Sequence, residues 1–258
     1  MATSGITSIV FFFIITTTYF IIQNYIPREK VQVKNIASYI YFALVIIVEY
    51  ILQYNLTLEM CGEAQSSILY TALLPWVFIF GLIKIALTLF PSWLGPFSNT
   101  FGYLVTQLMG IKDLFNNILK NPDDMTRTSD NASLIVAIQD IYTDQSLIIN
   151  KITTNNFDKF WEKMTNQKFF RPTANEFKDK LEKLVYIKEL VSEYLWYILT
   201  GFMVSSLSYN AVTSEGCNVS AKEMKKRHDD FEKKEQAIQE DKGEDDPKIY
   251  RMRLHLCN

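Results

Sequence analysis

The sequence predicts an all-α integral membrane protein with about four transmembrane helices, an interfacial amphipathic helix and a small helical loop subdomain. The first observation is that apolar residues, 48% of the 258-residue chain, are concentrated in four blocks. The second is a group of Pro, Trp and Gly residues that ends the third block and precedes an amphipathic pattern. The third is a polar segment with helical periodicity between the third and fourth blocks. Because globular helices of this length carry a polar face, the first three blocks are too apolar for a soluble core.

The first block, about residues 6–22, contains "IVFFFIITTTYFII" without any charge. It is long enough for a marginal span, since a crossing needs about 20 residues. A cleaved signal peptide is the alternative. No Lys or Arg precedes the apolar run and no small-x-small cleavage site follows it, so we expect an uncleaved anchor.

The second block, 36–54, is interrupted only by Glu49, and the third, 68–90, only by Lys84. The fourth, 190–209, is the least hydrophobic, and a buried helix of a soluble domain is its alternative reading. Its aromatic and small residues suit helix packing in lipid, which favours a span. The expected organisation is three transmembrane helices in 1–90, an interfacial helix and a helical loop in 91–189, the fourth transmembrane helix in 190–209 and a charged tail in 210–258.

The distribution of Lys and Arg predicts the orientation. The loop between the first two blocks holds Arg28, Lys30 and Lys34, whereas "NLTLEMCGEAQSS" between the second and third holds neither Lys nor Arg. The positive-inside rule places the first loop in the cytosol. Four spans then put both termini on the other side and the long loop in the cytosol. The basic tail segment "KEMKKRHDDFEKKE" opposes this arrangement, and the tail is cytosolic if the fourth block does not span.

Two pairs of residues fall on the expected non-cytosolic side. Asn55 and Asn218 begin glycosylation sequons, although a third sequon, at Asn131, falls on the cytosolic side. Cys61 and Cys217 each lie just outside a span, where a disulfide could join two hairpins. Two free buried thiols are the alternative for the cysteines.

The stretch "FPSWLGPFSNTFGYLVTQLMG", 90–110, marks the exit from the third span. Pro91 and Pro96 end that helix, and Trp93 and Phe97 are expected at headgroup depth. Asn99 or Thr100 can cap a new helix that continues to about residue 119. Its expected apolar face consists of Phe101, Leu104, Val105, Leu108, Ile111, Phe115, Ile118 and Leu119, and its polar face of Thr106, Gln107, Asp113 and Asn117.

We expect this helix to lie in the membrane interface, with Phe101, Leu104, Leu108, Ile111 and Phe115 among acyl chains and the polar face open to a partner protein. Packing of the apolar face against the loop subdomain is the alternative. The rest of the loop predicts helical segments, the last of them beginning at a Thr173 cap and leading into the fourth span.

No motif for catalysis or cofactor binding is found in the sequence. It has no Gly-rich phosphate loop, HExxH, GxSxG or cluster of carboxylates at metal spacing. Its three cysteines lack CxxC spacing and only two histidines are present, which makes a zinc site of the usual kind unlikely to form. The formal charge of −2 leaves no dominant basic face for nucleic acid. We therefore expect no enzyme, no metal, no cofactor and no nucleic-acid partner.

Three ionisable residues lie within the apolar blocks. A charge inside a membrane helix costs a few kcal/mol, so it needs a partner or must reach the headgroups. Glu49 is expected to reach the outer headgroups. Lys84 and Glu193 come to within about one turn of the same depth, at ~1.5 Å per residue, and are expected to form an ion pair. Such a pair more often stabilises packing than conducts ions.

The stretch "TALLPWVFIFGLIKIALTLFPSWLGPFSNTFGYLV", 71–105, resembles a multi-pass membrane protein family of the nucleocytoplasmic large DNA viruses, such as phycodnaviruses and mimivirus relatives. The features that resemble it are an apolar span with an internal Pro-Trp and the Phe-Pro-x-Trp and Pro-Phe-Ser-Asn-Thr-Phe-Gly residues that follow. "SSLSYNAVTSEGC", 205–217, is similar to the same group. The resemblance implies a structural protein of the membrane beneath an icosahedral capsid, with no catalytic residues.

We therefore expect a structural multi-pass membrane protein, a scaffold or minor capsid-associated protein of the internal membrane of a large DNA virus. Its expected partners are the lipid bilayer and other virion or membrane proteins, including capsid proteins, which bind its loop and tail. Its expected locations are the virion internal membrane and host endomembranes during assembly. The alternative is a small ion channel or transporter in which Glu49, Lys84 and Glu193 line a pore.

Overall fold

The computed structural model describes residues 5–61, 68–121, 132–214, 225–226 and 228–236. These ranges are helical apart from turns and one isolated antiparallel bridge between Leu119 and Phe170. Four helical stretches within them are long and apolar enough to cross a membrane: Gly5–Tyr25, Val31–Cys61, Ile68–Leu89 and Ala174–Ser214. The predicted fold class is confirmed, and the helices make the chain a multi-pass membrane protein by their length and composition.

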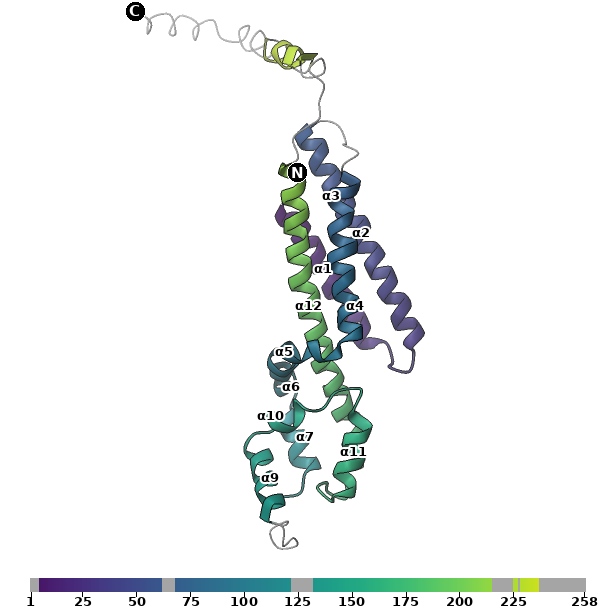
Figure 1. Ribbon diagram of the computed structural model, residues 1–258, viewed down its shortest axis with the longest axis vertical. Helices are drawn as coiled ribbons and strands as arrows, with labels where there is room; N and C mark the ends of the chain where they lie inside the picture. Colours follow the sequence, from purple (N-terminus) through teal and green to yellow (C-terminus); the bar gives the residue numbers. More distant parts are fainter. Residues whose placement is uncertain (1–4, 62–67, 122–131, 215–224, 227, 237–258) are drawn as a thin grey trace, which may run out of the picture.

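The membrane part is a long helical bundle (Figure 1). It contains α1 (Gly5–Tyr25), α2 (Val31–Cys61), the upper part of α12 (Lys178–Ser214), and a rod made of α3 (Ile68–Leu74), η1 (Pro75–Phe80) and α4 (Gly81–Leu89). The η1 segment is a π-helical turn that begins at Pro75, whose ring nitrogen cannot donate the usual backbone hydrogen bond. The start of α1 and the end of α12 lie at the same end of the bundle.

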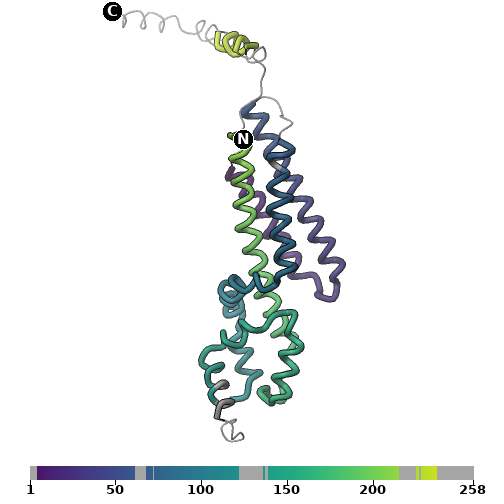
Figure 2. Tube along the Cα trace, viewed as in Figure 1, coloured from purple at the N-terminus to yellow at the C-terminus, as the bar shows by residue number. Residues whose placement is uncertain are grey.

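A helical subdomain lies at the opposite end (Figures 1 and 2). The chain enters it through η2 (Pro91–Leu94), α5 (Gly95–Phe97), η3 (Ser98–Gly102) and α6 (Tyr103–Leu108). It continues with α7 (Ile111–Ile118), α9 (Ala132–Thr143), α10 (Ser146–Ile149), α11 (Phe157–Asn166) and η4 (Ala174–Phe177). The subdomain has its own apolar core, separate from the core of the bundle.

Helix α12 belongs to both cores. Leu181, Leu184 and Val185 are buried in the subdomain, and Tyr197 and Val204 are buried in the bundle. At ~1.5 Å per residue its 37 residues extend about 55 Å, well beyond the ~30 Å of a hydrocarbon core. One unbroken helix therefore connects the membrane part to the subdomain.

The structure corrects the single interfacial helix predicted to continue to residue 119. Helix α6 ends at Leu108, Gly110 adopts a left-handed backbone with φ 85°, and α7 starts in a new direction at Ile111. Ile111 and Phe115 are fully buried in the subdomain core and do not reach acyl chains. The alternative reading, packing against the subdomain, is correct for this second half.

The predicted polar face is open only in its second half, where Asp113 and Asn117 of α7 are exposed. Thr106 is fully buried, and a Cβ atom added to Gly102 would overlap the backbone of Lys188 on α12. The small and polar side of η3 and α6 therefore packs against α12. The apolar side, with Phe101, Leu104 and Leu108, remains exposed.

Of the predicted helix caps, only Thr173 lies at the start of its helix. Thr173 precedes η4 without a side-chain capping hydrogen bond. Thr100 lies within a continuous helical stretch, and its hydroxyl donates to the carbonyl of Pro96 at 2.6 Å. The helix after the third span therefore starts close to the prolines, because Pro is compatible with the first turn of a helix.

Candidate functional site

A polar cavity of about 330 Å³ lies at the end of the bundle nearest the subdomain. The last turns of α1 and α4, the first turns of α2 and the middle of α12 converge there. Its polar lining comprises Tyr19 and Gln23 of α1, Lys34, Asn35 and Ser38 of α2, Lys84 and Thr88 of α4, Thr154 of the loop, and Tyr186, Glu189, Glu193 and Tyr197 of α12. The cavity thus combines two ammonium groups with two carboxylates at the depth where the helices leave the bundle.

Lys84 and Glu193 are both in the wall of this cavity, as their predicted common depth requires. Lys84 Nζ lies 5.0 Å from the ring centre of Tyr39 and 5.9 Å from that of Phe42. Glu193 has the hydroxyl of Tyr197, one turn along α12, as a hydrogen-bond partner. The two charges attract each other across the cavity, but no ion pair within 4 Å joins them among the described residues. The predicted direct ion pair is therefore not formed in this structure.

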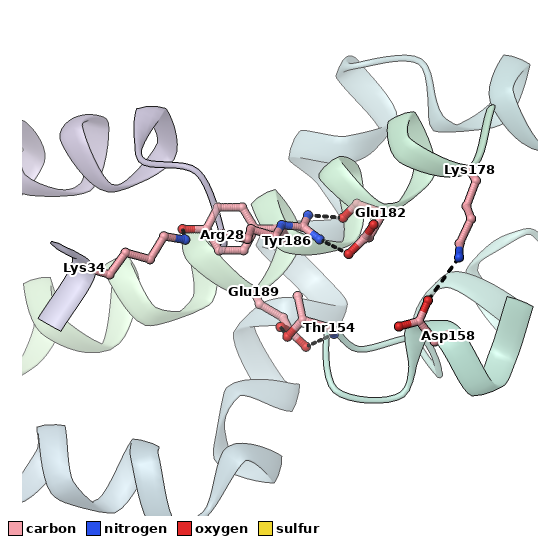
Figure 3. A network of polar contacts seen from close by, with 8 residues as sticks. All are labelled: Arg28, Lys34, Thr154, Asp158, Lys178, Glu182, Tyr186 and Glu189. Atoms are coloured by element: carbon pink, nitrogen blue, oxygen red, sulfur yellow. Dashed lines mark hydrogen bonds and ion pairs between the residues drawn. The ribbon is translucent and has the colours of Figure 1, made fainter. Parts of the chain in front are cut away.

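The loop between α1 and α2 is bound to α12 beside the cavity (Figure 3). Arg28 Nη1 donates to the carboxylate of Glu182 at 2.5 Å, and Nη2 donates to the backbone carbonyl of the same residue. Lys34 Nζ donates to the hydroxyl of Tyr186 at 2.8 Å, and that hydroxyl donates to the carbonyl of Gln23 at 3.2 Å. Arg28 and Lys34, which predict the orientation, therefore also attach the first loop and the start of α2 to the N-terminal part of α12.

On the subdomain side, two neighbouring residues of α12 hold the segment before α11. The Glu189 carboxylate accepts hydrogen bonds from the backbone N–H and the hydroxyl of Thr154, at 3.1 and 2.5 Å. Lys188 Nζ donates to the carbonyls of Ile149 and Ile152 at 2.6 and 2.9 Å. Lys188 is 1% exposed, and this burial lowers its pKa to about 8.

Sequence reasoning did not identify Lys188 or Glu189. A signal existed for Lys188, because it follows Leu181, Leu184 and Val185 at helical spacing on the apolar face of α12. A lysine at such a position must use its ammonium group on buried acceptors.

A layer of packed aromatic rings closes the cavity toward the far end of the bundle. Phe80, the last residue of η1 and one turn before Lys84, is fully buried, with its ring centre 5.2 Å from that of Tyr197 and 5.8 Å from that of Phe12. Phe12 in turn lies 5.3 Å from Trp76. These rings fill the space between the four membrane helices.

Glu49 lies on the far side of this layer, and the prediction that it reaches the headgroups is wrong. It is 1% exposed, and Ser8 of α1 donates a hydrogen bond to its Oε2 atom at 2.6 Å. Glu49 therefore faces α1 inside the bundle, because a hydroxyl partner is available there. Gln53, one turn further along α2, is also buried.

The residues predicted for the non-cytosolic side are only partly described. Cys61, at the end of α2, is disulfide-bonded, whereas Cys217 lies outside the described residues, so their pairing stays a prediction. Asn55 is an exposed residue within α2, but Thr57 of its sequon is buried and donates to the carbonyl of Gln53. Asn218 and Asn131 lie outside the described residues.

The predicted interfacial anchors lie in the stretch from η2 to α6, and most of them are exposed. Trp93, Phe101 and Leu104 are about half exposed and Leu108 is 83% exposed. Phe97 packs edge-on against Trp196 with ring centres 5.2 Å apart, and Trp196 Nε1 donates to the carbonyl of Trp93 at 2.9 Å. Their contact with lipid stays a prediction.

Within the described part of the chain no group of three or more His, Cys, Asp or Glu residues is placed to hold a metal ion. Comparisons with protein families, curated proteins and solved structures found no match to this chain.

Proposed function

We propose that the protein is a structural membrane scaffold that holds a helical subdomain at a fixed position on the bilayer and offers it to partner proteins. The observation that carries this proposal is the continuity of α12 through both apolar cores. A helix without a break transmits position and orientation from the bundle to the subdomain. A protein whose task is to present a binding surface needs this rigidity.

Three contacts support a rigid junction. Arg28 joins the first loop to Glu182, Lys188 joins α12 to the segment around α10, and Gly102 permits close contact between η3 and α12. They approach α12 from different elements. Together they fix the subdomain against α12 and join α12 to the first loop.

A small channel or transporter is the second candidate, and the polar cavity favours it. Ion conduction, however, needs a chain of polar groups through the bilayer. The buried rings of Phe12, Trp76 and Phe80 separate the cavity from Glu49. This arrangement supports the scaffold over the channel.

The membrane of a large DNA virus particle is the proposed location, and capsid or other virion proteins are the proposed partners. Support comes from the resemblance of residues 71–105 to the viral family. That stretch contains most of the third span, the aromatic exit and η3, which together lead from the bundle into the subdomain. The proposed binding surfaces are the exterior of the subdomain and the charged tail.

Breaking α12 at the junction tests the scaffold. Ile187→Pro removes a backbone donor in the middle of α12 and should uncouple the subdomain while four apolar stretches remain to insert. Crosslinking of the chain to its neighbours in the native membrane or particle should decrease at least tenfold. Ile187→Ala, which keeps the backbone donor, is the control and should retain the crosslinks.

Equal crosslinking of the two variants would contradict the scaffold. A flux assay in liposomes distinguishes the channel: ion flux that is lost in a Lys84→Met and Glu193→Gln double variant would establish the second candidate in its place.

A further inference from the structure

The separation of Lys84 and Glu193 leaves two opposite charges facing one cavity without direct contact. Lys84 touches aromatic rings, and Glu193 has a tyrosine hydroxyl, but the described residues place no ion pair between them within 4 Å. An unpaired charge in a membrane helix costs a few kcal/mol. A group that carries both charges could satisfy the ammonium and the carboxylate together.

The other lining groups divide in the same way. The wall formed by α2 and α4 contributes the donors Asn35 and Lys34 in addition to Lys84, and Lys34 also donates to the hydroxyl of Tyr186. The wall formed by α12 contributes the carboxylates of Glu189 and Glu193. The cavity therefore has a side suited to an anion and a side suited to a cation, and its four charged groups sum to zero.

The position of the cavity indicates which molecule brings such a pair of charges. It lies where α1 and α4 end and α2 begins, and Leu94, the neighbour of Trp93 in η2, is part of its wall. Tryptophan and the ends of apolar helices occur at the headgroup level of a bilayer. Its volume of about 330 Å³ is at the lower end of the ~300–1,000 Å³ typical of small-molecule sites.

We propose that this cavity binds the headgroup of an aminophospholipid such as phosphatidylethanolamine, with the phosphate beside Lys84 and the primary ammonium beside Glu193. The ammonium group donates hydrogen bonds to carboxylates, which a choline headgroup cannot do because its nitrogen carries no hydrogen. An anionic headgroup without an amine would bring a phosphate to Lys84 but no ammonium group to the carboxylate of Glu193. The site is thus selective for the zwitterion with N–H donors. This inference does not depend on the scaffold proposal, since a lipid site and partner binding are measured separately.

The full chain is purified and reconstituted in nanodiscs of phosphatidylcholine alone, or of phosphatidylcholine with phosphatidylethanolamine or phosphatidylglycerol. Thermal denaturation and native mass spectrometry then report stabilisation and retained lipid. We expect a rise in Tm of several degrees and a retained lipid only with phosphatidylethanolamine. Glu193→Gln and Lys84→Met should each abolish both effects. Glu49→Gln, a buried carboxylate of the bundle outside the cavity, is the matched control and should keep them.

A variant in which the charges of Lys84 and Glu193 are exchanged provides a second test if the single variants fold poorly. The Lys84→Glu and Glu193→Lys double variant keeps one positive and one negative charge in the cavity, but a carboxylate replaces the phosphate-binding ammonium. We expect this variant to fold and to lose the preference for phosphatidylethanolamine. A retained preference, or equal stabilisation of the wild type by phosphatidylcholine, would overturn the proposal. Stabilisation by soluble phosphoethanolamine without any effect of the lipid would overturn the assignment to a bilayer component.

Discussion

At the scale of single residues, the fold depends on places where two helices approach too closely for a side chain. Gly201 of α12 is buried, and a Cβ atom at this position would overlap the ring of Phe12 on α1. Ser205, Ser208 and Val212 continue the same side of α12 as buried positions. Small residues of this kind allow helices to pack in lipid, where apolar surface alone gives no preference for protein neighbours.

Replacing Gly201 by Ala should therefore destabilise the bundle. We expect a loss of about 1–3 kcal/mol, because the Phe12 ring must move out of a packed aromatic cluster. The measurement is unfolding of the purified protein in mixed micelles. Gly95→Ala is the matched control, since its added Cβ atom meets no atom within 4 Å and should leave stability unchanged. Equal losses in the two variants would contradict the close contact of α1 and α12.

The buried ammonium of Lys188 predicts a pH dependence of the subdomain. Burial lowers its pKa from 10.5 in the unfolded chain to about 8 in the folded one, so the unfolded state binds more protons between these values. Stability should thus rise with pH above about 8, by roughly 3 kcal/mol at most. Lys188→Met removes the titrating group. Unfolding midpoints of the wild type minus those of this variant, measured from pH 7 to 10, should increase, and a flat difference would refute the burial of the charge.

At the scale of elements, sequence patterns predicted the spans well and the segment after them poorly. An uninterrupted apolar run such as 6–22 can form only one structure in lipid, a helix whose backbone groups hydrogen-bond to one another. Helix α1 (Gly5–Tyr25) includes this run. The apolar face predicted by the periodicity of residues 101–119 can contact either lipid or a protein core. It continues across Gly110, whose positive φ turns the chain so that α6 exposes its apolar side and α7 buries it.

The candidate cavity, too, could be predicted only in part from local sequence patterns. Helix length and depth placed Lys84 and Glu193 at one level, but they could not show how far apart facing walls stand. Nor could charge alone place Glu49, because its orientation depends on Ser8, which lies 41 residues earlier in the chain. Local sequence patterns do not predict which side chains of distant elements contact each other.

The exposed apolar side of α6 should contact lipid. A spin label at Leu108 should show relaxation by lipid-soluble oxygen, whereas a label at Leu147, a half-exposed residue of α10, should show relaxation by a water-soluble nickel complex. Burial of such side chains is worth about 1.5–3 kcal/mol each. Asp at both Leu104 and Leu108 should therefore lift α6 from the surface, while its opposite side keeps the contact with α12. Water exposure of the Leu108 label in the wild type would contradict membrane contact.

At the scale of the whole molecule, charge and architecture point to one orientation. Arg28 of the first loop and Lys34 at the start of α2 are bound to Glu182 and Tyr186 of α12, at the subdomain end of the bundle. The start of α1 and the end of α12 lie at the other end. Since basic loops remain on the cytosolic side, the subdomain is expected in the cytosol together with the first loop.

Two half-exposed residues at opposite ends of the molecule allow this orientation to be measured. Met60 lies in the last turn of α2, at the end of the bundle away from the subdomain, and Leu147 lies in α10 of the subdomain. Each is changed to Cys in a chain whose three native cysteines are Ser, and sealed membrane vesicles with the cytosolic face outward are treated with an impermeant maleimide. Leu147→Cys should react at once, and Met60→Cys only after the vesicles are permeabilised. The inverse pattern would reverse the orientation. Equal reaction before permeabilisation would mean that the bundle does not cross the bilayer, because its two ends would then face the same solution.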